Sequence, residues 1–91
     1  MASDRIEAAD ALEGGRVVNP RGEDLGVIEE IMIDVPRGRV AYAVMACGLP
    51  ELAEKRVAVP WKDLTRDAEQ GCFVLDSDRE RLEQAPGLTY R

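Results

Sequence analysis

Apolar residues along the chain recur in short blocks that polar and turn-forming residues separate. Each block has the length of one strand, and most are rich in the β-branched side chains that favour strands. The blocks are residues 16–18, Leu25 to Val35, residues 39–47, residues 55–59 and residues 72–75. A further short pairing is expected near Leu64. The pattern therefore predicts five or six short strands, of the kind that form a small barrel or sandwich.

Two turn signatures join the first three blocks. Residues 19–22 (Asn-Pro-Arg-Gly) and 35–38 (Val-Pro-Arg-Gly) each place proline second and glycine fourth, as type I turns do. Such turns between strands indicate consecutive hairpins. The gap from Gly48 to Glu54 is too short for the crossover helix that a parallel pair needs. We therefore expect antiparallel pairing.

The second block does not alternate cleanly between apolar and polar residues. Its odd-numbered positions from Leu25 to Val35 are mostly apolar, but Ile28 and Met32 break the alternation. Such a strand is either covered on parts of both faces or carries a β-bulge. The third block also has apolar residues on both parities, so the two strands hold more apolar side chains than one small core can absorb. An isologous dimer would bury the excess.

The C-terminal region changes from strand to helix signals. Residues 77–80 (Ser-Asp-Arg-Glu) match the capping box that begins many helices. Leu82 and Ala85 follow three residues apart, and residues 86–87 (Pro-Gly) end the run. We expect one or two helical turns here, with Leu82 packed under the barrel. The segment from Asp4 to Leu12 is compatible with another brief turn.

Size and charge narrow the class of partner. Ninety-one residues suit a single domain, the net charge is −6, and no basic run exceeds two residues. Nucleic acids and anionic membranes attract lysine and arginine, so we expect contact with neither. No apolar run approaches the roughly 20 residues that span a bilayer, and the N-terminus lacks the profile of a signal peptide. A cytoplasmic protein that binds another protein is therefore expected.

Histidine, the commonest acid–base group in catalysis at neutral pH, is missing. The chain has no histidine, which excludes Ser–His and Cys–His pairs and most zinc catalysis. It has no glycine-rich phosphate loop, and Cys47 and Cys72 are too sparse for a disulfide framework. We expect both thiols to be reduced and buried, with a redox switch as the alternative. The sequence thus favours a non-catalytic protein without cofactor or metal.

The acidic second strand is the remaining candidate for chemistry. Glu29 and Glu30 are adjacent, so a regular strand points them to opposite faces. Glu30 and Asp34 share a face but lie about 13 Å apart at strand rise, which is too far for a catalytic carboxylate pair. Together with Asp24, these carboxylates form a solvated acidic face or, alternatively, a contact for a cation or a basic partner.

Two aromatic residues admit two interpretations each. Trp61 directly follows the fourth predicted strand, which Pro60 ends because it cannot donate to the ladder. In so small a core, the tryptophan either packs inside or is an exposed interface anchor, and Tyr42 in the third strand has the same alternatives. The candidate interaction residues are Glu29, Glu30, Met32, Asp34, Tyr42 and Trp61.

Several segments of the chain resemble the PRC-barrel domain. They are residues 15–19 (Gly-Arg-Val-Val-Asn), 22–30 (Gly-Glu-Asp-Leu-Gly-Val-Ile-Glu-Glu), 38–44 (Gly-Arg-Val-Ala-Tyr-Ala-Val) and 57–61 (Val-Ala-Val-Pro-Trp), with Asp34, Leu64, Leu82 and residues 85–86. The Gly-x-x-x-Gly turn before the acidic strand and the Val-Pro-Trp element are the most specific parts. The resemblance covers residues 10–88, so residues 1–9 are expected to form an N-terminal extension.

The resemblance implies an all-β fold, a six-stranded antiparallel barrel of SH3-like size. The family occurs in the cytoplasmic domain of the photosynthetic reaction-centre H subunit, in the C-terminal domain of a ribosome maturation factor, and as short stand-alone proteins. Its shared theme is protein–protein adaptation without common catalytic residues. Neither of the first two roles is expected to carry over, because this sequence shows no membrane helix and no preceding domain. Residues 49–53 also replace a glycine-rich stretch that stand-alone members often have.

The leading hypothesis is a non-catalytic interaction or adaptor module that self-associates as a homodimer and binds an unidentified protein. One alternative is a small-ligand or cation-binding regulatory domain that uses the acidic strand. The other is a ribosome-assembly-type adaptor that contacts a ribosomal protein and not RNA.

Overall fold

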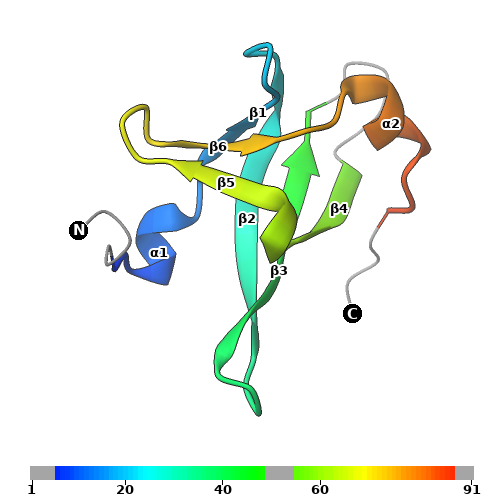
Figure 1. Cartoon of the computed structure of the whole chain (residues 1–91). Coiled ribbons are helices and arrows are strands. Elements are labelled where there is room, and N and C mark those ends of the chain that lie inside the picture. Colours follow the sequence, from blue (N-terminus) through cyan, green and yellow to red (C-terminus); the bar gives the residue numbers. More distant parts are fainter. Residues whose placement is uncertain (1–5, 49–54, 88–91) are drawn as a thin grey trace.

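The computed structural model describes residues 6–48 and 55–87, and it contains one strongly curled six-stranded sheet (Figure 1). All the predicted strands are present, including the short one that begins at Leu64. The elements are α1 (Ala9–Leu12), β1 (Arg16–Val18), β2 (Asp24–Asp34), β3 (Arg39–Cys47), β4 (Lys55–Pro60), the 3-10 turn η2 (Trp61–Asp63), β5 (Leu64–Asp67), β6 (Cys72–Leu75) and α2 (Arg79–Gln84). The mostly-β fold and the short C-terminal helix are therefore confirmed.

One strand pair departs from the expected antiparallel arrangement. The strand order is β4-β3-β2-β1-β6-β5, and β1 pairs with β6 in parallel, with Val17 opposite Phe73. The other four pairs are antiparallel. Short loops force antiparallel pairing only between strands that follow each other along the chain. Because β1 and β6 are separated by the whole β2–β5 segment, that constraint does not apply to them, and the purely antiparallel prediction was wrong for this pair.

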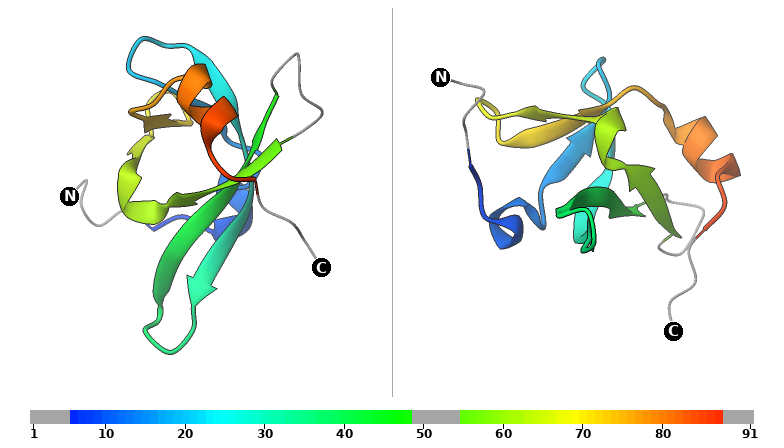
Figure 2. Two further views of the ribbon diagram at one scale, coloured as in Figure 1. Left: turned by 90° about the vertical axis from the view of Figure 1, so that its right-hand side faces the viewer. Right: turned by 60° about the horizontal axis from the view of Figure 1, so that its bottom comes forward.

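The sheet curls into a half-barrel with β4 and β5 at its two edges (Figure 2). Its two edge strands, β4 and β5, are consecutive in sequence and are joined by η2. Figure 2 shows the β5–β6 pair folding back over the β2–β3–β4 part of the sheet. Leu12 of α1 and Leu82 of α2 both pack against the enclosed core, so the short helices cover parts of the barrel that no strand closes. The prediction that Leu82 packs under the barrel is confirmed.

Two β-bulges explain the broken alternation of the second strand. The β2–β3 register shifts between Ile28 and Glu30, and again between Met32 and Ile33. The β1–β2 register also shifts, between Val17 and Val18, so that Leu25 has no direct partner in β1. Leu25 and Ile28, three residues apart, are both buried in the core. Val27, which shares its parity with Leu25, is 39% exposed. The bulge expected from the sequence is thus confirmed, whereas parity alone assigns the wrong environment to Val27.

The predicted turns and helix start can be checked against their hydrogen bonds. Gly22 donates its backbone N–H to the Asn19 carbonyl at 2.8 Å, and Gly38 donates to the Val35 carbonyl at 3.2 Å, so both turns form as predicted. Helix α2 begins one residue later than the capping box suggests, because Asp78 accepts the backbone N–H of Arg81 at 2.8 Å. An aspartate is as good an N-cap as a serine, and here it takes that position.

Candidate functional site

Strands β2 and β3 continue beyond the rest of the sheet as a two-stranded projection, which points downward in Figure 1. The last backbone hydrogen bonds from the β1 side reach Ile28, and the last pair between β3 and β4 joins Tyr42 to Pro60. We call residues 30–42, which run from beyond Ile28 to the last paired residue Tyr42, the hairpin arm. Its tip is fixed by Asp34, whose carbonyl accepts the Gly38 N–H at 2.8 Å and whose carboxylate accepts from Arg37.

The hairpin arm carries large apolar side chains into solvent. Ile33 is 52% exposed and Val35 is 77% exposed. The described part of the chain has only two other large exposed apolar side chains, Ile6 and Val27. Exposed apolar residues that stand together on a projecting element are typical of sites that another molecule covers.

The root of the arm is bordered by Trp61, which η2 places against the core. Its ring meets the Phe73 ring edge to face, with 5.7 Å between the centroids and 65° between the planes. Two grooves adjoin the indole. One, of 260 Å³, is lined by apolar residues of α1, β2, β3 and β6 and by the ion-paired Glu7 and Arg66. The other, of 410 Å³, is lined by residues that include Arg39 and Lys62. Trp61 is half-buried, so it both packs inside and keeps part of its surface accessible.

Three of the six candidate residues share the outer face of the arm. Met32 pairs with Tyr42 across the β2–β3 ladder, and Glu30 pairs with Val44 two positions along β3. Residues directly opposite each other in a sheet project to the same side. Glu30 is exposed, whereas Met32 and Tyr42 are half-buried. This face is therefore a mixed apolar and acidic surface.

The other three candidates lie apart from that face. Glu29 sits at the first bulge and binds Arg56 at 2.6 Å, and Asp34 binds Arg37 at 3.1 Å at the tip. Trp61 lies at the root, as described above. The sequence missed Ile33 and Val35 as candidates, although an apolar residue on each side of an acidic one near a proline turn is a visible signal.

The carboxylates of β2 are mostly engaged by arginine. Asp24 binds Arg16 at 2.8 Å, in addition to the two pairs of Glu29 and Asp34. Within residues 6–48 and 55–87, the structure gathers no group of three or more side chains suited to hold a metal ion. The acidic strand thus presents ion pairs to solvent, and the cation-binding alternative gains no support from its geometry.

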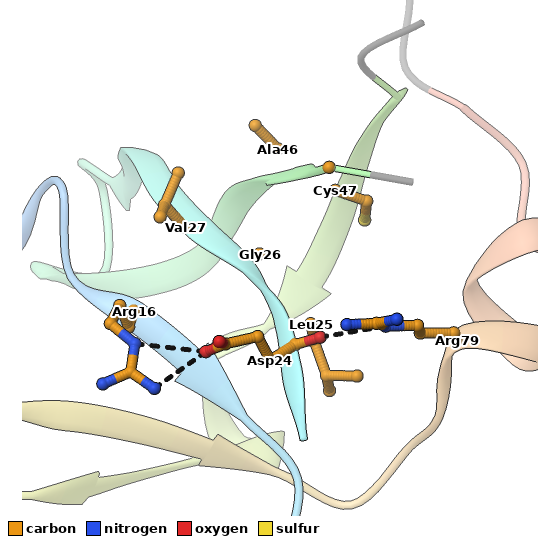
Figure 3. A pocket seen from close by; sticks show the side chains of 9 residues that line it. Arg16, Asp24, Leu25, Gly26, Val27, Ala46, Cys47 and Arg79 are labelled. Carbon is orange, nitrogen blue, oxygen red and sulfur yellow. Dashed lines mark hydrogen bonds and ion pairs between the residues drawn. The ribbon is translucent and has the colours of Figure 1, made fainter. Parts of the chain in front are cut away.

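A further groove, of 380 Å³, lies where β2 separates from the end of β3. Figure 3 shows Arg16 and Arg79 approaching Asp24 from opposite sides, and Arg79 donates to the Asp24 carbonyl at 3.2 Å. Both guanidinium groups are therefore partly used within the chain. No local sequence pattern indicates this groove, because it depends on the β2–β3 separation and on α2 lying nearby.

Both thiols are buried, as the sequence predicts, with Cys47 at 0% and Cys72 at 3% exposure. Burial raises the pKa of the Cys47 thiol, and the nearby Lys55 charge offsets part of that rise. We expect Cys47 to react with a thiol reagent far more slowly in the folded protein than in urea, measured in a Cys72→Ala background. Equal rates in the two states would contradict its burial.

The raised pKa also sets a direction for the pH dependence of stability. The unfolded thiol ionises first, so the folded state binds more protons above the unfolded pKa of about 8.5. The stabilisation from the neutral buried thiol is complete below that pH and is lost as the pH rises further.

Comparisons with known proteins add the following. A family model described as the PRC-barrel domain matches residues 4–82. Among solved structures, a protein of Pseudomonas aeruginosa described as a candidate 16S ribosomal RNA processing protein, RimM, superposes with a TM-score of 0.54 at 21% identity. The match covers 88% of this chain and 49% of that one, so the present chain spans about half the length of that protein. A search of curated proteins finds no match. None of the helices described here is long and apolar enough to cross a bilayer.

Proposed function

Because the chain belongs to the PRC-barrel domain family, we propose that it is a non-catalytic interaction module that binds protein partners through the hairpin arm. The observation that carries the proposal is the exposure of Ile33 and Val35 on an element that projects beyond the core. Burying such side chains in an interface stabilises a complex, because each removes apolar area from water. The residues 49–53, where the sequence departs from the family, lie outside the described residues and play no part in the proposal.

The chemistry of the chain supports binding over catalysis. There is no histidine, and the carboxylates Asp24, Glu29 and Asp34 are each held by an arginine. Binding sites typically combine exposed aromatic or aliphatic anchors with a polar rim. The arm offers that combination, with Ile33 and Val35 as anchors and the charged residues Arg37 and Arg39 beside them.

The proposed partners are a second copy of the chain and a further protein. The net charge of −6 favours a partner with a neutral or basic surface. The exposed apolar side chains of the arm, Ile33 and Val35, are the reason for including self-association, since an isologous contact buries the same residues twice.

The proposal is tested by capturing partners from a lysate of the source organism with purified chain as bait. An Ile33→Ser/Val35→Ser double variant should retain the captured protein at least about tenfold less well, because two apolar anchors are lost. Val27→Ser is the matched control, since Val27 is also an exposed valine of β2 but lies outside the arm. Equal retention by the double variant and the wild type would contradict the proposal.

A second candidate function is an adaptor in ribosome assembly. The fold likeness to the Pseudomonas RimM protein supports it, although at 21% identity that likeness concerns the fold. On this hypothesis a ribosomal protein appears among the captured partners, and its retention survives nuclease treatment because the acidic chain does not contact RNA.

A further inference from the structure

Beyond Ile28, β2 has no backbone-paired strand on its β1 side within the described residues. The carbonyl of Ile28 accepts the Gly14 N–H at 2.7 Å, and its N–H donates to the Gly15 carbonyl at 2.9 Å. Within residues 6–48 and 55–87, no later residue of β2 has a backbone partner on that side. We call residues 29–34 the open edge. An unpaired edge is a template for adding another strand.

The open edge differs from the two other free edges of the described sheet. Strand β4 ends in Pro60, and its Lys55 donates to the carbonyls of Leu82 and Glu83 at the end of α2. Strand β5 has four residues, and its Arg66 is ion-paired with Glu7 of the N-terminal segment at 3.1 Å. Proline, short length and charged side chains are the usual protections of an edge. The open edge contains no proline, the carboxylates at its two ends, Glu29 and Asp34, are engaged by arginines, and Ile33 between them is exposed.

We propose that a second copy of this chain pairs with the open edge, antiparallel and centred on Ile33, to form a continuous sheet across a dimer. The inference rests on the proposed function and assigns the surface and register of the self-association. In this arrangement Ile33 lies opposite Ile33 of the second copy, and each Val35 comes level with Ile31 of the other. The exposed apolar side chains of the arm are then buried against each other.

Charge and apolar pattern select this register over its neighbours. Centring the pair on Met32 would place Glu30 opposite Asp34 of the second copy, and like charges directly opposite each other are destabilising. Centring it on Ile31 would place Ile33 opposite Glu29, so the most exposed apolar residue of the strand would face a carboxylate. Centring on Ile33 keeps the carboxylates from facing each other and pairs Ile33, the most exposed apolar residue of the strand, with itself, while Met32 lies opposite Asp34.

A second copy fits better than an unrelated strand because the edge is self-complementary about Ile33. An isologous contact needs the same patch on both partners, and residues 31, 33 and 35 supply it symmetrically. Such a short pairing buries less than the roughly 1,200 Å² of a standard interface. We therefore expect a weak dimer that forms and dissociates with concentration.

Analytical ultracentrifugation over a range of concentrations tests the dimer. The wild-type chain should shift from monomer to dimer, and Ile33→Lys should raise the dissociation constant at least about tenfold, because it sets two ammonium groups against each other at the symmetry axis. Ala58→Lys is the control, since Ala58 is an exposed β4 residue away from the open edge. Circular dichroism checks that both variants are folded.

A disulfide experiment tests the register independently of stability. Opposed Cβ atoms in an antiparallel pair lie about 4.5–5.5 Å apart, close enough to be bridged with small adjustments. Mild oxidation should therefore link the Ile33→Cys chain into a dimer faster than the Glu30→Cys chain, whose positions are far apart in this register. The native thiols do not interfere, because Cys47 and Cys72 are buried.

The outcomes separate this inference from the proposed function. A wild-type chain that stays monomeric at all concentrations, yet captures a partner through the arm, overturns the dimer and keeps the proposed function. A dimer that Ile33→Lys leaves intact, or equal oxidation of the two cysteine variants, also overturns the inference, because another surface or register then makes the contact.

Discussion

Replacing Phe73 by alanine is expected to lower the free energy of unfolding by about 3–5 kcal/mol. Phe73 is the largest fully buried side chain, at 1% exposure. The substitution also removes the edge-to-face contact of the Phe73 ring with Trp61. It removes the contact with the Arg66 guanidinium as well, which lies 4.9 Å from the centroid of that ring. A domain of this size has only about 5–15 kcal/mol of total stability, so the variant should be close to unfolding. Urea titration followed by circular dichroism measures the loss.

Two controls separate the loss of the ring from a general effect of mutation. Phe73→Leu keeps much of the buried volume, so it should lower the free energy of unfolding by less than half as much as Phe73→Ala does. Val35→Ala removes apolar atoms from an exposed position and should change the free energy of unfolding by no more than about 0.5 kcal/mol. If Phe73→Ala cost no more than Val35→Ala, Phe73 would not be the centre of the core. The single tryptophan, Trp61, reports the same transition by fluorescence because its ring contacts Phe73.

The strands could be predicted because each depends on local sequence. The block of residues 39–47 forms β3 with the same limits, and the turn at residues 35–38 fixes its pairing with β2. Local turn chemistry and β-branched composition decide such hairpins. The short strand after η2 was expected near Leu64 and begins there.

Features that depend on distant parts of the chain could not be predicted in the same way. The parallel contact of Val17 with Phe73 joins segments that share no turn, so no local signal specifies its direction. The choice of Asp78 over Ser77 as the helix cap depends on where the chain leaves β6, because both residue types cap well. In both cases the competing alternatives are close in local energy, and tertiary packing decides between them.

The candidate site was predictable in part. Met32, Tyr42 and Glu30 come together on one face because strand pairing places them there, although the sequence offered only a general acidic strand. Ile33 has the same parity as Ile31, which packs against the core, but it lies further along the projecting arm and is exposed there. A period-two pattern gives the side on which a residue projects but not where the strand passes beyond the core, which is why the sequence missed the most exposed apolar residues of β2 and its turn.

Replacing Gly26 by alanine is expected to destabilise the protein by about 3 kcal/mol, in the upper range for a side chain forced into packed structure. A Cβ atom at Gly26 would lie 2.3 Å from the Ala46 carbonyl oxygen and 3.1 Å from Cγ of Met45. The first contact is with backbone, which cannot turn aside as a flexible side chain can. Strand β2 would have to move away from β3 at the start of their ladder, where Val27 pairs with Ala46.

The matched control for Gly26 is Gly48→Ala, because a Cβ atom at Gly48 meets nothing within 4 Å. That variant should unfold at the same urea concentration as the wild type or slightly above it, since alanine reduces the entropy of the unfolded chain. Equal stability of the two variants would mean that β2 and β3 can move apart at Gly26 without lowering the free energy of unfolding. The hairpin arm begins only a few residues further along the same ladder. If β2 could move relative to β3 at Gly26, the arm would not be held in one position, and Ile33 would not be held in place for a partner.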